Sequence, residues 1–218
     1  MDLSPKDIKV EYLSNYLIGK KVNEFKNFYD VKDQFPVNIE LIIEKNIGLN
    51  IEPKSGIEEE CNIFALLQHD LITILVDAGH LLNDRFKNIY RFDLAHEIGH
   101  WFLHKEVYQN VSFKSLDEWY SFMKEMPEKT HMFFEYQANE FAGQLLVPRA
   151  LLKSEILPYK DEINEIMKEN PEMGIVDIIP YIAPRILQKF GVSEKVISIR
   201  LKREKIIHDL IDLSNSEY

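Results

Sequence analysis

Apolar residues recur at helical spacing in the first part of the chain. Between residues 5 and 30 they form one stripe, which predicts a helix that begins near Pro5. The stripe consists of Ile8, Tyr12, Leu13, Tyr16, Leu17, Val22, Phe25, Phe28 and Tyr29. Because aromatic residues at this spacing usually pack inward, we expect them in the core. Residues 34–37 break the pattern, and Asn38 is placed to cap a short second helix that runs to about Lys45.

Three short segments rich in Ile, Leu and Val follow at residues 47–51, 62–68 and 71–77. Their length and composition predict strands. His69 and Asp70 lie between the last two segments, where they predict a tight hairpin turn. We therefore expect a small, mainly antiparallel sheet packed on helices, which is an α+β fold.

Helical spacing returns in the middle of the chain. Asn83 or Asp84 is placed to cap a helix that runs to about His104, and Thr130 is placed to cap a second helix. The connection between these helices, residues 105–130, contains an amphipathic segment that predicts a short helix over 116–124. We expect this connection either to wall a cleft or to fill a gap in the core.

Helices also dominate the last part of the chain. They are punctuated by four prolines, Pro158, Pro171, Pro180 and Pro184. Residues 186–201 resemble a helix-turn-helix, with Gly191 in the turn and Ser193 as the cap of the second helix. This second helix offers two acids and the basic residues Lys195, Arg200, Lys202 and Arg203. The patterns divide the chain into a helical leader at 1–30, a core at 31–150 and a helical C-terminal subdomain at 151–218.

Composition narrows the class of protein. The chain has 218 residues, of which 45% are hydrophobic, and this is enough for a packed core. The single cysteine, Cys61, excludes an internal disulfide and fits a reducing cytoplasm. No secretory signal opens the sequence and no apolar run is long enough to span a bilayer, so we expect a soluble cytoplasmic protein without a membrane partner. The formal net charge of −10 disfavours direct DNA binding by the surface as a whole.

One motif carries chemistry: His96-Glu97-Ile98-Gly99-His100, an H-E-x-x-H pattern. On a helix the two histidines lie one turn apart on the same face, so both imidazoles can bind one metal ion. Glu97 lies roughly 100° round the helix from His96, where it can take a proton from a water on that ion without being a ligand. The pattern is therefore typical of metallohydrolases.

The residues around the motif argue against a solvated helix face. Six apolar residues surround it, namely Leu94, Ala95, Ile98, Trp101, Phe102 and Leu103. A polar cluster in such a helix needs partners, which a bound cation would supply. A glycine inside a helix lowers the stability of the helix by about 1 kcal/mol relative to alanine. Either close packing of another helix or the surroundings of the ion would explain why Gly99 is present.

A catalytic zinc usually has three protein ligands, so a further donor is needed. Glu135 is the best candidate, because it shares a helix face with the small residues Ala138 and Ala142, which allow close approach to the first helix. Glu140 lies roughly 140° away from Glu135 around the helix and is expected to be solvated. Two acids of the connection, Asp117 and Glu118, are rival donors.

Two blocks of the sequence resemble the ImmA/IrrE family of metallopeptidases. The first is the H-E-x-x-H motif preceded by Phe92, Leu94 and Ala95, and the second is an E-x-x-A-N-x-F-A-x-x-L-L-V-P run from Glu135 to Pro148. The resemblance covers about the middle half of the chain, from near residue 35 to residue 148. It implies a zincin-like core in which His96, His100 and Glu135 bind one Zn²⁺, with Mn²⁺ or Fe²⁺ also compatible, and Glu97 is the general base.

The resemblance also bears on residues near the site. By it, the strand at 71–76 would pair with an extended substrate. Asn139 stands where the related thermolysin-like pattern has an acid, and its amide can still hydrogen-bond a ligand imidazole. His104 continues the histidine face, and we interpret it as a helix-end residue or a neighbour of the ligands. The candidates to stabilise an oxyanion are Tyr120, His131 and Tyr136.

The function implied is hydrolysis of a peptide bond in a specific protein. By resemblance the substrate is a helix-turn-helix repressor encoded nearby, whose loss derepresses mobile-element or stress genes. The alternative is a non-proteolytic regulator, in which the metal only stabilises a fold that binds a repressor or a toxin. A DNA-binding regulator that uses the C-terminal helices is a third hypothesis, which the acidic charge disfavours.

Overall fold

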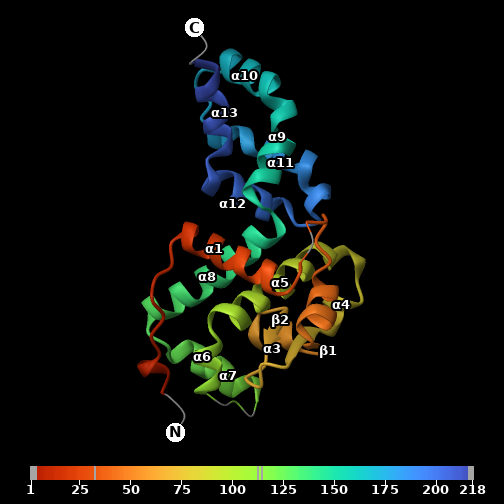
Figure 1. Ribbon diagram of the computed structural model, residues 1–218, viewed down its shortest axis with the longest axis vertical. Coiled ribbons are helices and arrows are strands. Elements are labelled where there is room, and N and C mark those ends of the chain that lie inside the picture. The colour runs from red at the N-terminus through yellow and green to blue at the C-terminus, as the bar shows by residue number, and fades with distance from the viewer. Residues whose placement is uncertain (1–3, 32, 112, 114, 216–218) are drawn as a thin grey trace. The chain divides into compact units, whose positions relative to one another are not determined.

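The computed structural model describes residues 4–31, 33–111, 113 and 115–215 (Figure 1). It contains two compact units, one formed by Met1–Gln34 and Asn38–Leu145 and the other by Phe35–Val37 and Leu146–Tyr218. Residues 1–3 and 216–218, the outer ends of the expected leader and C-terminal subdomain, lie outside the described residues. None of the described helices is long and apolar enough to cross a membrane.

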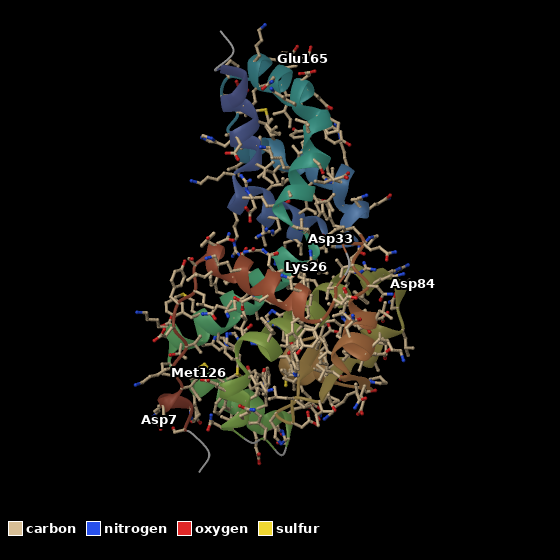
Figure 2. All side chains as sticks on the ribbon, in the orientation of Figure 1. Asp7, Lys26, Asp33, Asp84, Met126 and Glu165 are labelled. Atoms are coloured by element: carbon tan, nitrogen blue, oxygen red, sulfur yellow. The ribbon has the colours of Figure 1, made fainter. Side chains whose placement is uncertain are left out.

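The first unit combines helices with a small sheet, so the fold is α+β. Its strands are β1 (Asn50–Lys54), β2 (Ala65–Leu67) and β3 (Thr73–Asp77). Its helical elements are η1 (Pro5–Asp7), α1 (Asn15–Phe28), α2 (Ile39–Leu41), η2 (Ile42–Ile47), α3 (Ile57–Cys61), α4 (Ala78–Leu81), η3 (Asp84–Phe86), α5 (Lys87–Leu103), α6 (Lys105–Gln109), α7 (Leu116–Glu125) and α8 (Glu128–Leu146). Side chains fill the space between helices and sheet (Figure 2).

The sheet is mixed, and the expectation of a mainly antiparallel sheet is wrong. Its order is β1-β3-β2. β2 and β3 form the predicted antiparallel hairpin, with Leu66 opposite Leu75, but its turn is longer than the tight turn expected at His69 and Asp70, because β2 ends at Leu67 and β3 begins at Thr73. β1 pairs with β3 in parallel, with Ile51 opposite Ile74, because the connection through α3 and β2 returns the chain in the direction of β1. β3 is therefore the central strand, and its five residues are all buried.

The central place of β3 also corrects the expected substrate strand. Residues 71–76 include most of β3, whose backbone is paired on both sides. A strand with both edges paired has no free ladder for a peptide. The outer strand on the side of α5 is β2, which packs against that helix.

The N-terminal helix starts later than predicted. Residues 8–14 are not helical, and α1 begins at Asn15 after Ser14, whose hydroxyl accepts a hydrogen bond from the Leu17 N–H at 3.3 Å. The backbone of residues 8–14 lacks helical hydrogen bonds and is bound by α8, whose Gln137 side chain donates to the Glu11 carbonyl at 2.6 Å. At the other end of α1, Lys26 forms an ion pair with Asp33 (Figure 2).

The later start changes which residues of the stripe are buried. Ile18, Val22 and Phe25 form the inner face of α1. The aromatic residues Tyr16 and Phe28 are 69% and 80% exposed, so the expectation that the whole stripe lies in the core is wrong.

The two long helices of the middle region begin in different ways. Asn83 caps η3 rather than α5 itself, as its side chain accepts a hydrogen bond from the Arg85 N–H at 3.1 Å, and α5 follows directly with Phe86 before its first residue. Thr130 does not cap α8, which begins at Glu128. Pro127 lies directly before the first helical residue, and its carbonyl accepts the first hydrogen bond of the helix, from the His131 N–H at 3.0 Å.

The second unit is helical in the part that the structure describes. Its elements are α9 (Arg149–Ile156), η4 (Leu157–Tyr159), α10 (Lys160–Glu169), α11 (Ile175–Phe190), α12 (Glu194–Glu204) and α13 (Ile206–Asn215). Pro180 and Pro184 lie inside α11 and do not end it. Both prolines are on the exposed face, so water can satisfy the carbonyls that lose their helical partner.

The turn between α11 and α12 contains Gly191 in the left-handed conformation, with a φ of 60°. Ser193 precedes α12 without a side-chain capping hydrogen bond. Arg200 is not a surface residue of α12, because it is 2% exposed. Its guanidinium donates to the Val147 carbonyl at 3.2 Å and pairs with Glu204 at 2.7 Å.

Candidate metal centre

The H-E-x-x-H motif lies in the last two turns of α5, as its apolar surroundings indicate. Leu94, Ala95 and Ile98 are fully buried and hold the helix in the core. His96 and His100 project from one face, and their Nε2 atoms are 2.9 Å apart. The spacing of four residues therefore brings both imidazoles to one point.

Helix α8 supplies the third donor. Oxygens of Glu135 lie 3.4 Å from His96 Nε2 and 3.6 Å from His100 Nε2. Donor atoms of these three residues all lie within 4.8 Å of one another, and they form the only such group of three found among the described residues. The rival donors Asp117 and Glu118 are exposed on α7 and do not belong to it.

Gly99 explains how the two helices come so close. A Cβ atom at Gly99 would lie 2.9 Å from Cα and 3.0 Å from the carbonyl oxygen of Ala138. Only glycine fits against that backbone, so close packing of α5 on α8 accounts for the residue. Ala138, one of the small residues that the sequence places near Glu135, lies at this contact.

Glu97 is buried beside the group and is held by the sheet. Its Oε2 accepts a hydrogen bond of 2.7 Å from the backbone N–H of Leu67 in β2. Burial raises the pKa of Glu97 to about 7, against the lowering effects of His96 and the Leu67 N–H. Glu135 and Asp93 add to the rise. A carboxylate with a pKa near neutrality can both take up and release a proton.

His96 and Glu135 form an electrostatic pair. Burial lowers the pKa of His96, but its hydrogen bond to Glu135 and the charges of Glu97, Glu135 and Asp93 together raise it to about 9. Burial raises the pKa of Glu135, yet the bond to His96 and the nearby histidines lower it below its ordinary value. The site therefore favours a positive charge next to Glu135.

His104 ends α5 and contacts a ligand candidate. It is the C-terminal cap of the helix, and its Nδ1 lies 3.0 Å from His100 Nδ1. Burial lowers the pKa of His104 to about 4, so the ring is neutral at neutral pH. Its Nε2 lies 3.1 Å from Oε1 of Gln137, a residue that sequence reasoning missed because its partners are far away in the chain.

Two further residues of α8, Glu140 and Asn139, differ from the burial and the hydrogen bonding expected of them. Glu140 is fully buried rather than solvated, since the face opposite Glu135 is also covered, and it accepts a hydrogen bond of 3.0 Å from Gln144. Asn139 is exposed, and its amide donates to the Glu135 carbonyl of its own helix at 2.8 Å.

A cavity of about 530 Å³ adjoins the group. Its wall includes Glu135, His131 and Tyr120, so two of the oxyanion candidates face the same space as a ligand candidate. The third, Tyr136, packs its ring on Tyr12 with the centroids 6.0 Å apart. Most of the remaining wall is apolar and comes from α3, α7 and the residues next to them: Cys61, Ile63, Trp119, Met123 and Met126. Helix α7 of the connection at 105–130 thus lines a cleft, and it also fills the core, because Leu116 lies in a buried cluster with Ile57, Cys61, Leu66 and Leu75.

Two histidines and a glutamate converge on two packed helices of an α+β fold, with donor atoms that all lie within 4.8 Å of one another, so the three residues could hold a metal ion, as in H-E-x-x-H metallohydrolases. The family model described as the IrrE N-terminal-like domain, of the M78 peptidases, matches residues 81–202, which is more than half of the chain. The chain therefore belongs to the ImmA/IrrE family of metallopeptidases. A comparison with curated proteins gives no match.

Proposed function

We propose that this protein is a zinc-dependent endopeptidase with a zincin-like core, in which His96, His100 and Glu135 hold the ion and Glu97 is the general base. The observation that carries the proposal is the convergence of the three donors within 4.8 Å, with the Glu97 carboxylate beside them but bound by the Leu67 N–H. Two imidazoles and one carboxylate are a set of ligands that catalytic zinc uses, and they leave a coordination position open.

The chain's own residues account for the proton transfers. A zinc ion bound there would polarise the scissile carbonyl and lower the pKa of water. Glu97 takes a proton from the attacking water and delivers it to the leaving amine, so the peptide bond is replaced by one carboxylate and one amine. Its raised pKa of about 7 suits both halves of this transfer. Tyr120 and His131, which line the cavity, are the candidates to stabilise the developing oxyanion.

The proposed substrate is a specific cytoplasmic protein, a helix-turn-helix repressor encoded nearby, whose cleavage derepresses mobile-element or stress genes. Family membership supports a protein substrate. The apolar part of the 530 Å³ cavity wall would suit a large apolar side chain next to the scissile bond, although Lys124 and Glu128 also line the cavity. We interpret α11 and α12 as a helix-turn-helix that docks protein rather than DNA, because Arg200 is buried in the unit.

The test is to incubate the purified protein with the repressor encoded beside its gene and to follow fragments by mass spectrometry. Glu97→Gln should bind zinc at the wild-type stoichiometry and lose cleavage by about 1,000-fold or more, since it keeps the shape and removes the base. Glu140→Gln is the matched control, because Glu140 is also a buried glutamate but lies outside the group. It should cleave as the wild type does.

Two outcomes would contradict the proposal. Cleavage by Glu97→Gln at the wild-type rate would remove Glu97 from the chemistry. Inactivation of the repressor by wild type and Glu97→Gln alike, in stable complexes without fragments, would favour a non-proteolytic regulator in which the metal only stabilises the fold.

A further inference from the structure

A series of hydrogen bonds, buried as far as Gln137, leads from the proposed metal centre to the N-terminal segment, which is residues 8–14 before α1. It starts at His100, whose Nδ1 is 3.0 Å from Nδ1 of His104. Nε2 of His104 lies 3.1 Å from Oε1 of Gln137, and Nε2 of Gln137 donates to the carbonyl of Glu11 at 2.6 Å. His104 and Gln137 are 4% and 2% exposed, so water does not replace these bonds.

The series has only one consistent arrangement of protons for neutral rings. A backbone carbonyl can only accept, so the Gln137 amide group must face Glu11 and its Oε1 must face His104. His104 Nε2 must then carry a proton and donate it to Oε1, which leaves Nδ1 of His104 as an acceptor. His100 Nδ1 must in turn carry the proton of that ring.

This arrangement leaves Nε2 of His100 without a proton. Nε2 is the atom that lies 2.9 Å from His96 Nε2 and 3.6 Å from Glu135, at the point where the ligand candidates converge. A metal binds the unprotonated nitrogen of an imidazole, and the bond made by the other nitrogen decides which one is free. The carbonyl at Glu11 thus sets the tautomer of His100 through two side chains.

We propose that His104 and Gln137 are positioning residues that fix the metal-binding tautomer of His100, with the N-terminal segment as their anchor. The inference rests on the proposed metal site and adds to it the residues that prepare one ligand. Phe134 supports the geometry by packing on both rings, with its centroid 4.2 Å from that of His100 and 4.3 Å from that of His104.

The first test is zinc affinity, measured by competition with a chromophoric chelator. His104→Phe keeps a ring against Phe134 but removes the acceptor for His100 Nδ1, and it should weaken zinc binding by about 10- to 100-fold. His104→Asn restores an acceptor oxygen near the position of Nδ1 and should recover most of the affinity. Gln137→Met removes the Oε1 acceptor, frees the His104 tautomer and should weaken binding toward the lower end of that range.

A matched control is available on the same helix. Gln144 is a second glutamine of α8 that donates to backbone near the N-terminus, at the carbonyl of Asn15, the first residue of α1, at 2.9 Å, but it takes no part in the series. Gln144→Met should therefore keep the wild-type affinity. Glu11→Ala should also keep it, because only the backbone carbonyl of Glu11 is used.

The second test needs no metal and no variant. Long-range ¹H–¹⁵N spectra of the metal-free wild type should show His100 protonated at Nδ1 and His104 at Nε2. The opposite tautomer of His100 would overturn the inference, as would wild-type zinc affinity in both His104→Phe and Gln137→Met. If the wild type binds no zinc at all, the proposed function fails, whereas zinc binding with unchanged affinity in these variants overturns the positioning role alone.

Discussion

At the scale of single residues, the charge balance of the centre is set by His96 and Glu135. The pair places a protonated imidazole 3.4 Å from a carboxylate, at the position where a cation would bind. His100 differs from His96, because burial and the neighbouring histidines lower its pKa well below the ordinary value. A metal ion at the proposed site would therefore compete with a proton on His96.

This competition makes zinc affinity depend on pH. With a His96 pKa raised to about 9, the ring is protonated at neutral pH and must lose that proton on binding. The apparent zinc affinity should fall by about tenfold for each pH unit below that value, with about one proton released per zinc. Chelator competition and calorimetry in buffers of different ionisation enthalpy measure both quantities. An affinity that does not change between about pH 7 and 8.5 would contradict the assigned proton.

At the scale of elements, the contact between α5 and α8 positions the centre. Gly99→Ala should destabilise the protein by about 1–3 kcal/mol, because the new methyl group meets the Ala138 backbone and overrides the better helix propensity of alanine. Chemical denaturation measures the change. Gly19→Ala is the control, since its methyl group meets only the end of the Gln144 side chain. Equal stability of Gly99→Ala and wild type would contradict the close contact.

Arg200 gives a second test at this scale. Arg200→Met should destabilise the protein by about 2–4 kcal/mol, because it leaves Glu204 without this partner and removes a donor to the Val147 carbonyl. Lys202→Met, an exposed change on the same helix, should stay within about 0.5 kcal/mol of wild type. Thermal and urea unfolding compare them. A tolerated Arg200→Met would mean that this arginine does not hold α12.

The sequence pattern predicted the elements that are stabilised by interactions between residues close together in the sequence. The spacing of His96 and His100, the apolar residues around them and the hairpin of β2 and β3 all depend on neighbours in sequence. The extended segment before α1 was not predictable, because Gln137 binds it from 126 residues away. The parallel pairing of β1, the burial of Glu140 and the hydrogen bond from Leu67 to Glu97 also depend on partners distant in sequence, so local patterns could not predict them.

At the scale of the whole molecule, the acidic net charge disfavours nucleic acid as a partner, and membership of a peptidase family supports a protein substrate. The net charge is −10, and the family match at 81–202 includes parts of both compact units. We expect no binding to duplex DNA at about 150 mM salt, since the 36 acidic residues outnumber the 26 basic ones and repel the phosphate backbone. Fluorescence anisotropy with labelled duplex DNA, including the operator of the proposed repressor substrate, measures this. Tight binding at that salt concentration would favour a DNA-binding regulator instead.

The most direct test of the proposed zinc centre is elemental analysis of protein purified without added metal. The wild type should contain about one equivalent of zinc, and His100→Ala and Glu135→Ala should both lose it, because a centre with two remaining protein ligands binds zinc weakly. Asp117→Ala, which removes an exposed acid outside the group, should keep it. A wild type that neither contains nor takes up zinc, or zinc retained in both ligand variants, would contradict the proposed centre.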